Sequence, residues 1–304
     1  MARIQNPIVP GWYADPEARC YGGRYYIYVT RSFTEYEKQM NLDAFSSEDL
    51  VHWTKHDGIV QMDGFPHVWR AVWAPTVIEK DKKYYLIFAT NDIHSNEEPG
   101  GLEIAVADRP EGPFRAYLGR PLVGEFINGA QPIDAHLFKD SDGTVYLYYG
   151  GWGHCNVAVM NETMDGFVPF ADGELFHEVT PPSYVEGPCM LKCGETYFFM
   201  WSLGNWTDGS YRVNAAKGQS PLGPFSEPFT VVERDGVVAE GPGHHGYLHI
   251  PETDEWFLVY HRRNIGDPEP GNRMLCIDRM EVTPEHIGKV KMTRSFERWM
   301  CRKT

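Results

Sequence analysis

The sequence predicts an all-β fold, a five-bladed β-propeller with about four antiparallel strands in each blade. Glycine and proline supply 30 and 22 of the 304 residues and interrupt every long helical period of apolar residues. Aromatic segments with strand-like composition recur five times, roughly every 50 to 60 residues. A repeat of this length holds about four strands, which is typical of a propeller blade, and blades bury their faces only by stacking on one another.

The five aromatic segments are predicted to be the strands that return after a hairpin in each blade. Each follows a short turn such as Gly22-Gly23 or Asp140-Ser141-Asp142-Gly143, and these turn residues suit a β-hairpin. Aromatic residues also favour strands. The predicted return strands are residues 24–29, 83–88, 144–149, 196–200 and 255–260.

Later strands of the blades are indicated by a second recurring phrase. Residues 104–107 precede Gly112-Pro113-Phe114, and residues 214–216 precede Gly223-Pro224-Phe225. Proline is tolerated at a sheet edge but not at its centre, so each phrase predicts an inner strand followed by an edge strand. Residues 43–53 have a similar role in the first repeat. We expect residues 276–282 to pair with the N-terminal strand and close the ring, so that residues 1–304 form a single propeller domain.

Composition excludes several classes of function. The formal charge of −14 disfavours binding to a phosphate backbone, which requires clustered Lys and Arg, so no nucleic-acid partner is expected. No apolar run reaches 18 residues, so no membrane span is expected. The N-terminus has no apolar signal region, which predicts a cytoplasmic location, with secretion after removal of a signal as the alternative. The six cysteines form no C-x-x-C pair and are predicted to be reduced, mostly buried thiols: Cys20, Cys155, Cys189, Cys193, Cys276 and Cys301.

The start of each repeat carries one distinctive residue among apolar or turn residues. Inner strands of a propeller begin at the central channel, so residues at matching positions of the repeats are expected to converge there. Three of them are carboxylic acids, which cannot all ionise easily at close range, so their pKa values are pushed apart. One carboxyl can then act as an acid and another as a base. The five residues are Asp15, Trp73, Asp134, Glu186 and His244.

Glu186 is the carboxyl expected to keep its proton near neutral pH. It stands in the apolar run Tyr184-Val185-Glu186 and is followed by Gly187-Pro188. Burial disfavours the charged form of a carboxyl group and raises its pKa. Hydrolysis of a glycosidic bond with inversion needs such an acid, together with a base about 6.5–9.5 Å away that activates water.

The motifs that carry these residues resemble glycoside hydrolase family 43. They are Tyr13-Ala14-Asp15-Pro16, Trp73-Ala74-Pro75, Ile133-Asp134 and Val185-Glu186-Gly187-Pro188, and the resemblance runs from about Asn6 to Val282. It implies a five-bladed propeller with its active site on the central axis. It also implies an inverting enzyme, because family members are mostly inverting β-xylosidases, α-L-arabinofuranosidases and arabinanases.

The resemblance also implies a role for each matching residue. Asp15 is then the general base that activates water, and Glu186 is the general acid. Asp134 raises the pKa of Glu186 and holds its orientation. Trp73 forms an apolar wall of the subsite for the terminal sugar, and Arg273, in Gly271-Asn272-Arg273, contacts that sugar.

No cofactor is required for this chemistry, but the resemblance implies that a structural calcium ion can occupy the central channel. The family motif Gly-x-Gly-His matches Gly241-Pro242-Gly243-His244, which makes His244 the candidate ligand and His245 the alternative. One histidine is a weak calcium site, because calcium prefers six to eight oxygen ligands. A histidine that only hydrogen-bonds within the channel is the other interpretation. A transition-metal site is disfavoured, because adjacent strand residues point to opposite faces.

Several further residues are candidates for the walls of the pocket. Ala135 follows Asp134 where many members have proline, and Cys189 replaces a bulky aromatic residue, which would enlarge the subsite beyond the cleaved bond. Residues 65–70 are expected to shape the mouth, and residues 91–101 to form a solvated loop. The aromatic residues predicted as candidates for the substrate walls are Phe33, Trp152, Trp201 and Trp206.

The predicted function is an inverting exo-glycosidase that releases terminal α-L-arabinofuranose, β-D-xylose or both from plant cell-wall oligosaccharides of arabinoxylan or arabinan. These two sugars place their hydroxyl groups alike. The absence of the extra β-sandwich of large β-xylosidases favours the arabinofuranosidase. The alternatives are an endo-arabinanase with an open groove and a non-catalytic carbohydrate-binding propeller, although no carboxylate is missing here. A retaining fructosidase would require Asn-Asp-Pro where this chain has Ala14-Asp15-Pro16.

Overall fold

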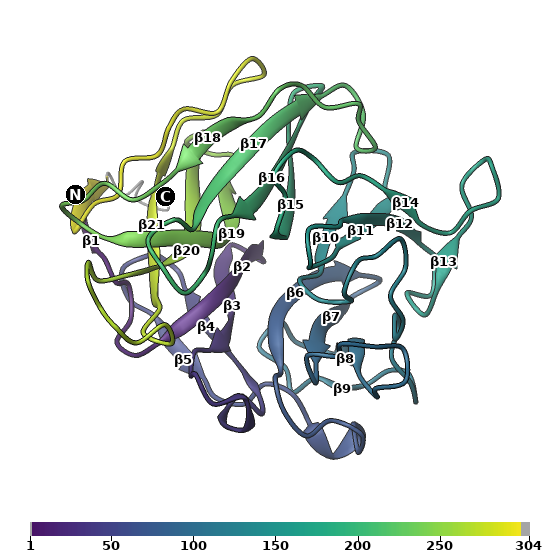
Figure 1. The fold of residues 1–304 in the computed structure, drawn as a ribbon. Helices are drawn as coiled ribbons and strands as arrows, with labels where there is room; N and C mark the ends of the chain where they lie inside the picture. The colour runs from purple at the N-terminus through teal and green to yellow at the C-terminus, as the bar shows by residue number, and fades with distance from the viewer. Residues whose placement is uncertain (1, 299–304) are drawn as a thin grey trace.

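Five small antiparallel sheets form a ring in the computed structural model, which describes residues 2–298 (Figure 1). The predicted five-bladed β-propeller is therefore confirmed. Helix is confined to two short 3-10 turns in the described residues, η1 (Tyr36–Lys38) and η2 (Met62–Gly64). Within residues 2–298 neither turn has the length or apolar character needed to cross a membrane.

Each blade is a meander whose first strand lies nearest the axis. Blade 1 contains β2 (Tyr13–Tyr21), β3 (Arg24–Arg31), β4 (Leu42–Ser47) and β5 (Thr54–His56). Blade 2 contains β6 (Trp73–Lys80), β7 (Lys83–Thr90), β8 (Gly101–Ala107) and β9 (Arg115–Ala116). Blade 3 contains β10 (His136–Lys139), β11 (Val145–Tyr149), β12 (Asn156–Met160) and β13 (Phe167–Val168), and β14 (His177–Glu178) also pairs with β12. Blade 4 contains β15 (Glu186–Cys193), β16 (Thr196–Leu203), β17 (Arg212–Gly218) and β18 (Phe229–Val232). Blade 5 contains β19 (Glu240–Ile250), β20 (Glu255–Arg263) and β21 (Met274–Met280).

The second strand of every blade matches an aromatic segment predicted from the sequence. These strands are β3, β7, β11, β16 and β20. The predicted inner strands at residues 104–107 and 214–216 lie within β8 and β17. Edge strand β9 follows Phe114 directly, whereas β18 begins four residues after Phe225.

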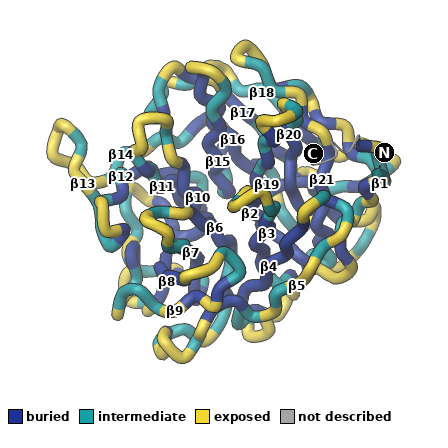
Figure 2. The backbone as a smooth tube through the Cα atoms, turned by 180° about the vertical axis from the view of Figure 1, so that it is seen from behind, coloured by how far each residue is buried: buried dark blue, intermediate teal, exposed yellow. Residues whose placement is uncertain are grey.

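The hydrophobic core lies between blades rather than within them. Each of five clusters of buried apolar side chains joins two neighbouring blades. In β16, Phe198 packs toward Leu258 of blade 5, while its neighbour Phe199 packs toward Tyr148 of blade 3. Successive strand residues point to opposite faces, so one strand serves both interfaces. The buried strands seen from behind in Figure 2 therefore form one continuous ring.

The prediction that residues 276–282 pair with the N-terminal strand is wrong. β21 pairs only with β20, and β1 (Ala2–Gln5) pairs instead with β22 (Ser295–Arg298). The chain after β1 still runs beside β21: the Asn6 side chain bonds both the N–H and the C=O of Ile277, at 2.9 and 2.7 Å. No ladder forms there, because Pro7 and Pro10 have no N–H to donate.

The cysteine predictions can be checked at most positions. Cys155, Cys189 and Cys276 are buried free thiols, and Cys193 is a half-buried free thiol. Cys301 lies outside the described residues.

Candidate active site

A bend repeated at the inner end of all five blades positions the site. At each bend one residue has a positive φ, although only one of the five is glycine. In four blades a β-bulge interrupts the first ladder at this point. Bulges re-aim side chains, and left-handed non-glycine residues concentrate at functional sites. The five residues and their φ values are Asp15 (51°), Ala74 (47°), Asp134 (57°), Gly187 (63°) and His244 (33°).

Trp73 and Glu186 lie one residue earlier in the repeat than the other three predicted site residues. The register pairs Ala14 with Thr30 and pairs Glu186 with Ser202, so Glu186 corresponds to Ala14 and not to Asp15. The expectation that the three carboxylates occupy matching positions is therefore wrong for Glu186. Two positions of the repeat supply the carboxylates, and Glu186 enters the site from a different point on its strand.

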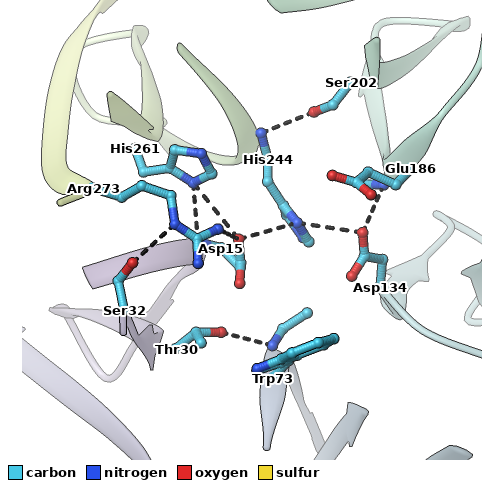
Figure 3. A network of polar contacts seen from close by, with 12 residues as sticks. Asp15, Thr30, Ser32, Trp73, Asp134, Glu186, Ser202, His244, His261 and Arg273 are labelled. Atoms are coloured by element: carbon cyan, nitrogen blue, oxygen red, sulfur yellow. Dashed lines mark hydrogen bonds and ion pairs between the residues drawn. The ribbon is translucent and has the colours of Figure 1, made fainter. Parts of the chain in front are cut away.

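Hydrogen bonds between neighbouring blades hold three of the five bends. Each runs from the backbone N–H at a bend to a side chain in the second strand of the preceding blade (Figure 3). The bonds are Ala74 N–H to Thr30 Oγ1 at 2.8 Å, His244 N–H to Ser202 Oγ at 2.8 Å, and Asp15 N–H to His261 Nδ1 at 3.3 Å.

Blade 3 departs from this arrangement. Its equivalent second-strand position is Gly150, where a Cβ atom would lie 2.1 Å from the carbonyl oxygen of His154. No side chain fits there, and Gly187 N–H donates instead to Asp134 Oδ2 at 3.0 Å. The backbone beside Glu186 is thus tied directly to the neighbouring carboxyl group.

One pocket of about 280 Å³ contains nine of the ten predicted site residues. His245 does not line it, and Trp201 is fully buried in the core between blades 3 and 4. Residues 65–70, expected at the mouth, do not line this pocket either. The pocket-lining residues are Asp15, Phe33, Tyr36, Gln39, Trp73, Asp92, Gln131, Ile133, Asp134, Trp152, Glu186, Trp206, His244 and Arg273.

Asp15 is a buried carboxylate surrounded by nitrogen atoms. Arg273 Nη1 lies 3.3 Å from Asp15 Oδ1, and His244 Nδ1 lies 3.4 Å from the same oxygen. Burial alone would raise the pKa of Asp15, but the positive charge of Arg273 acts against burial, and the net shift is downward. The pKa of Asp15 therefore lies below its usual value, and the group is ionised at neutral pH.

Asp134 and Glu186 have the opposite tendency. Burial raises the pKa of both groups, and the charge of Asp15 raises both further. The charge of Glu186 also raises the pKa of Asp134, which is the more strongly shifted of the two. Asp134 is 6% exposed, whereas Glu186 is only half-buried and reaches further into the pocket. The pair can therefore retain a proton near neutral pH, with Glu186 as the member better placed to pass it on.

His244 separates the two aspartates. Its Nδ1 atom lies 3.4 Å from Asp15 Oδ1 and 3.4 Å from Asp134 Oδ2 (Figure 3). Burial lowers the pKa of His244 despite the nearby charge of Asp15, so the ring is neutral. A neutral ring here keeps the base and the Asp134–Glu186 pair apart without adding a charge.

The channel residues fit a calcium ion poorly. Among residues 2–298 no three His, Cys, Asp or Glu side chains are grouped to hold a metal. The partly buried Arg19 side chain of blade 1 donates to the carbonyl oxygens of Val77 in blade 2 and Leu137 in blade 3, at 2.9 and 2.6 Å, and pairs with Glu17, which places a cation where these blades meet. Calcium prefers six to eight oxygen ligands, and a resident cation competes for those present. We therefore assign no step to a metal ion.

Several pocket residues were not foreseen. Gln39 accepts a hydrogen bond from Trp73 Nε1, and the Tyr36 ring packs edge-on against Trp73 at 4.9 Å. Tyr36 begins the 3-10 turn η1 after β3 and Gln39 directly follows that turn, and so short an element gives no periodic signal. Gln131 Nε2 donates to Asp92 Oδ1 at 2.9 Å, and it stands only two residues before Ile133-Asp134, which was a usable signal.

The prediction of a solvated loop at residues 91–101 is wrong at its start. Asn91 is 2% exposed, and its side chain bonds the carbonyl oxygens of His67 and Pro99. Asp92 follows it into the pocket, where burial raises its pKa. A polar segment is usually predicted to be exposed to solvent. Here the hydrogen-bonding groups of Asn91 find their partners within the protein.

Sequence and structure comparisons relate this chain to glycoside hydrolases. The family model described as "Glycosyl hydrolases family 43" matches residues 4–287. A curated relative from Aspergillus niger, "Beta-D-galactofuranosidase xynD", is 41% identical over 93% of this chain and 85% of its own length. A "Beta-xylosidase" from Xylanibacter ruminicola is 26% identical over 91% and 96%. The crystal structure of an α-L-arabinofuranosidase from Clostridium thermocellum matches with a TM-score of 0.75 and 25% identity, covering 94% of this chain and 96% of that one.

Proposed function

The chain belongs to glycosyl hydrolases family 43, and from this premise we propose that it is an inverting, exo-acting glycosidase. It would remove a terminal α-L-arabinofuranosyl or β-D-xylosyl residue from plant cell-wall oligosaccharides such as those of arabinoxylan or arabinan. The observation that carries the proposal is that the pKa values of the three carboxyl groups are shifted in opposite directions. The pKa of Asp15 is lowered, while the pKa values of Asp134 and Glu186 are raised, within one pocket.

In the proposed reaction Asp15 and Glu186 act on opposite faces of the sugar. Asp15 takes a proton from a water molecule as the water oxygen bonds to the anomeric carbon. Glu186 gives its proton to the glycosidic oxygen as the bond from that oxygen to the anomeric carbon breaks. One water is consumed, the anomeric configuration inverts, and the two carboxyl groups exchange protonation states, which solvent then restores.

The size of the pocket supports exo action. About 280 Å³ lies at the small end of the range for ligand pockets and suits a single sugar residue better than a polysaccharide chain. Aromatic side chains of Phe33, Trp73, Trp152 and Trp206 supply its apolar walls. Such walls favour the apolar face of a sugar ring, and the carboxyl groups and Arg273 remain for the hydroxyl groups.

A second candidate substrate is a terminal β-D-galactofuranoside, favoured by the relative at 41% identity. β-D-Galactofuranose has the ring configuration of α-L-arabinofuranose and carries one additional hydroxymethyl group on its exocyclic carbon. A pocket that binds the furanose ring can therefore serve both sugars if its wall leaves room for that group. Specificity between them then depends on the wall residues and not on the three carboxyl groups.

The test is a side-by-side assay on the 4-nitrophenyl α-L-arabinofuranoside, β-D-xyloside and β-D-galactofuranoside, repeated with Asp15→Ala. We expect activity on at least one substrate and a loss of about 10²- to 10⁴-fold in the variant. Asp57→Ala, at an exposed aspartate of blade 1, is the matched control and should retain full activity. If the folded protein hydrolysed none of the three substrates, exo action on these sugars would be contradicted.

A further inference from the structure

We propose that Tyr211 is a positioning residue for proton donation by Glu186, and that its stacking partner His261 ties it to Asp15. This inference rests on the proposed function. Tyr211 and His261 thus form a unit, here called the Tyr–His bridge, that holds the acid at a fixed place relative to the base. Neither residue lines the pocket, and neither was singled out by the sequence motifs.

The acid end of the bridge is a short hydrogen bond. Tyr211 Oη lies 2.7 Å from Glu186 Oε1, and Tyr211 is 1% exposed. The phenol donates to Oε1, which leaves Oε2 to carry the proton that the leaving group receives. When Glu186 becomes a carboxylate, the same bond becomes charge-assisted and therefore stronger. Tyr211 thus stabilises the state that the proton transfer creates.

The base end of the bridge is His261. Its ring stacks on the Tyr211 ring at 5.7 Å with an interplanar angle of 8°, and both residues are buried. Its Nδ1 atom accepts the backbone N–H of Asp15 at 3.3 Å, so this nitrogen carries no proton. Burial lowers the pKa of His261 well below its usual value, which is consistent with a neutral ring. A neutral acceptor can hold this bond throughout the working pH range.

Close packing leaves the bridge little freedom. A Cβ atom at Gly243 would lie 2.1 Å from Tyr211 Cε1, so the phenol ring lies directly against the backbone of β19. Gly243 pairs with His261 across the ladder between β19 and β20. Only glycine permits this approach, and the position of the Tyr211 hydroxyl is therefore set by backbone on one side and by the His261 ring on the other.

The charges that face Glu186 come from several elements. Asp15 of β2, Asp134 ahead of β10 and Asp92 after β7 disfavour its ionised form, whereas Arg273 ahead of β21 favours it. His244 of β19 is neutral, and its Nδ1 atom lies 3.4 Å from Asp134 Oδ2. The three carboxyl groups oppose ionisation of Glu186. The Tyr211 hydroxyl, which donates a hydrogen bond to Glu186, favours it. Its removal should raise the pKa of Glu186.

The test is Tyr211→Phe, with pH profiles of kcat on two glycosides of the preferred sugar. One glycoside has a poor leaving group, and the other has 2,4-dinitrophenolate. We expect the alkaline limb to move up by about one pH unit and turnover of the poor leaving group to fall about tenfold. Turnover of the dinitrophenyl glycoside should stay unchanged, because it needs little protonation. A purely structural role would slow both substrates alike and would not move the limb.

Two further variants complete the test. Tyr148→Phe removes an equally buried phenol that bonds only the carbonyl oxygen of Pro221, at 2.6 Å, and should leave the limb in place. Gly243→Ala displaces the Tyr211 ring without deleting it and should move the limb in the same direction as Tyr211→Phe. An unchanged limb in Tyr211→Phe, or in Gly243→Ala where Tyr211→Phe does not fold, would overturn the proposal. A wild-type protein without glycosidase activity would instead refute the proposed function.

Discussion

Arg273 Nη1 lies 3.3 Å from Asp15 Oδ1, although the two residues are 258 positions apart in the chain. Arg273 also donates from Nε to Ser32 Oγ at 2.9 Å, so its guanidinium group is fixed between β3 and the start of β21. The contact joins blade 5 to blade 1. The charged environment of Asp15 therefore forms only when blades 5 and 1 meet and the ring closes.

Replacement of this arginine should move the acid limb of the pH profile. In Arg273→Met the largest favourable charge near Asp15 is lost, so the pKa of Asp15 rises, by about 1–3 units for a carboxylate beside arginine. Activity requires ionised Asp15 and is lost as pH falls through that pKa, so the limb moves to higher pH. The measurement is kcat/KM against pH, which reports groups of the free enzyme.

The matched control for that experiment is Arg279→Met. Arg279 lies in β21, the strand that Arg273 directly precedes, but it is about half exposed and pairs with Glu255 at 2.8 Å, away from the pocket. Its replacement should leave the acid limb in place. If Arg273→Met shows the same acid limb as the wild-type enzyme, Arg273 does not set the charge state of Asp15.

Loss of the acid should depend on the leaving group. Glu186→Ala is expected to lower turnover of an unactivated glycoside by about 10²- to 10⁴-fold, because the leaving oxygen receives no proton. An activated aryl glycoside should be largely spared. The check is the ratio of kcat on the two substrates, and an equal loss on both would assign another role to Glu186.

Asp134→Asn should move the alkaline limb downwards, opposite to the shift expected for Tyr211→Phe. Glu186 raises the pKa of Asp134, and the repulsion between two carboxylates is reciprocal, so an uncharged amide of similar shape should lower the pKa of Glu186. Activity needs protonated Glu186 and is lost as pH rises through its pKa. The limb is read from kcat against pH, and an upward shift would show that the charge of Asp134 does not sustain the proton on Glu186.

Chelation should leave the enzyme unchanged. Arg19 supplies a cation from the chain itself where blades 1, 2 and 3 meet, and it pairs with Glu17 and with carbonyl groups of blades 2 and 3. Treatment with excess EDTA is therefore expected to preserve both activity and melting temperature. A loss that added calcium restores would support the calcium site that the sequence motif predicts at His244 and would contradict this expectation.

The sequence was sufficient for those features that repeat with the blades. The aromatic return strands and the starts of the inner strands are local signals and were found where their spacing predicted, and the Asp15, Asp134 and Glu186 motifs bring their carboxyl groups to one pocket. The one-residue offset of Glu186 was missed, because it shows only in the strand register, where Glu186 pairs with Ser202 as Ala14 pairs with Thr30.

Contacts that exist only in the closed ring could not be foreseen. Tyr211 stands in no motif, and its bond to Glu186 and its stacking on His261 depend on how blades 4 and 5 meet. Likewise, the pairing of β1 with β22 was missed because residues 295–298 carry no strong strand pattern. Asp92 was misread because its polar neighbours resemble an ordinary surface loop.

The most direct test of the central claim is the configuration of the first product. The wild-type enzyme should be mixed with an α-L-arabinofuranoside, or the preferred sugar from the assay above, and followed by ¹H NMR before mutarotation. Inversion by Asp15 and Glu186 predicts that the β-anomer of arabinofuranose appears first and the α-anomer only later. Initial accumulation of the α-anomer would mean a covalent, retaining pathway and would contradict the assignment of Asp15 as the base that activates water.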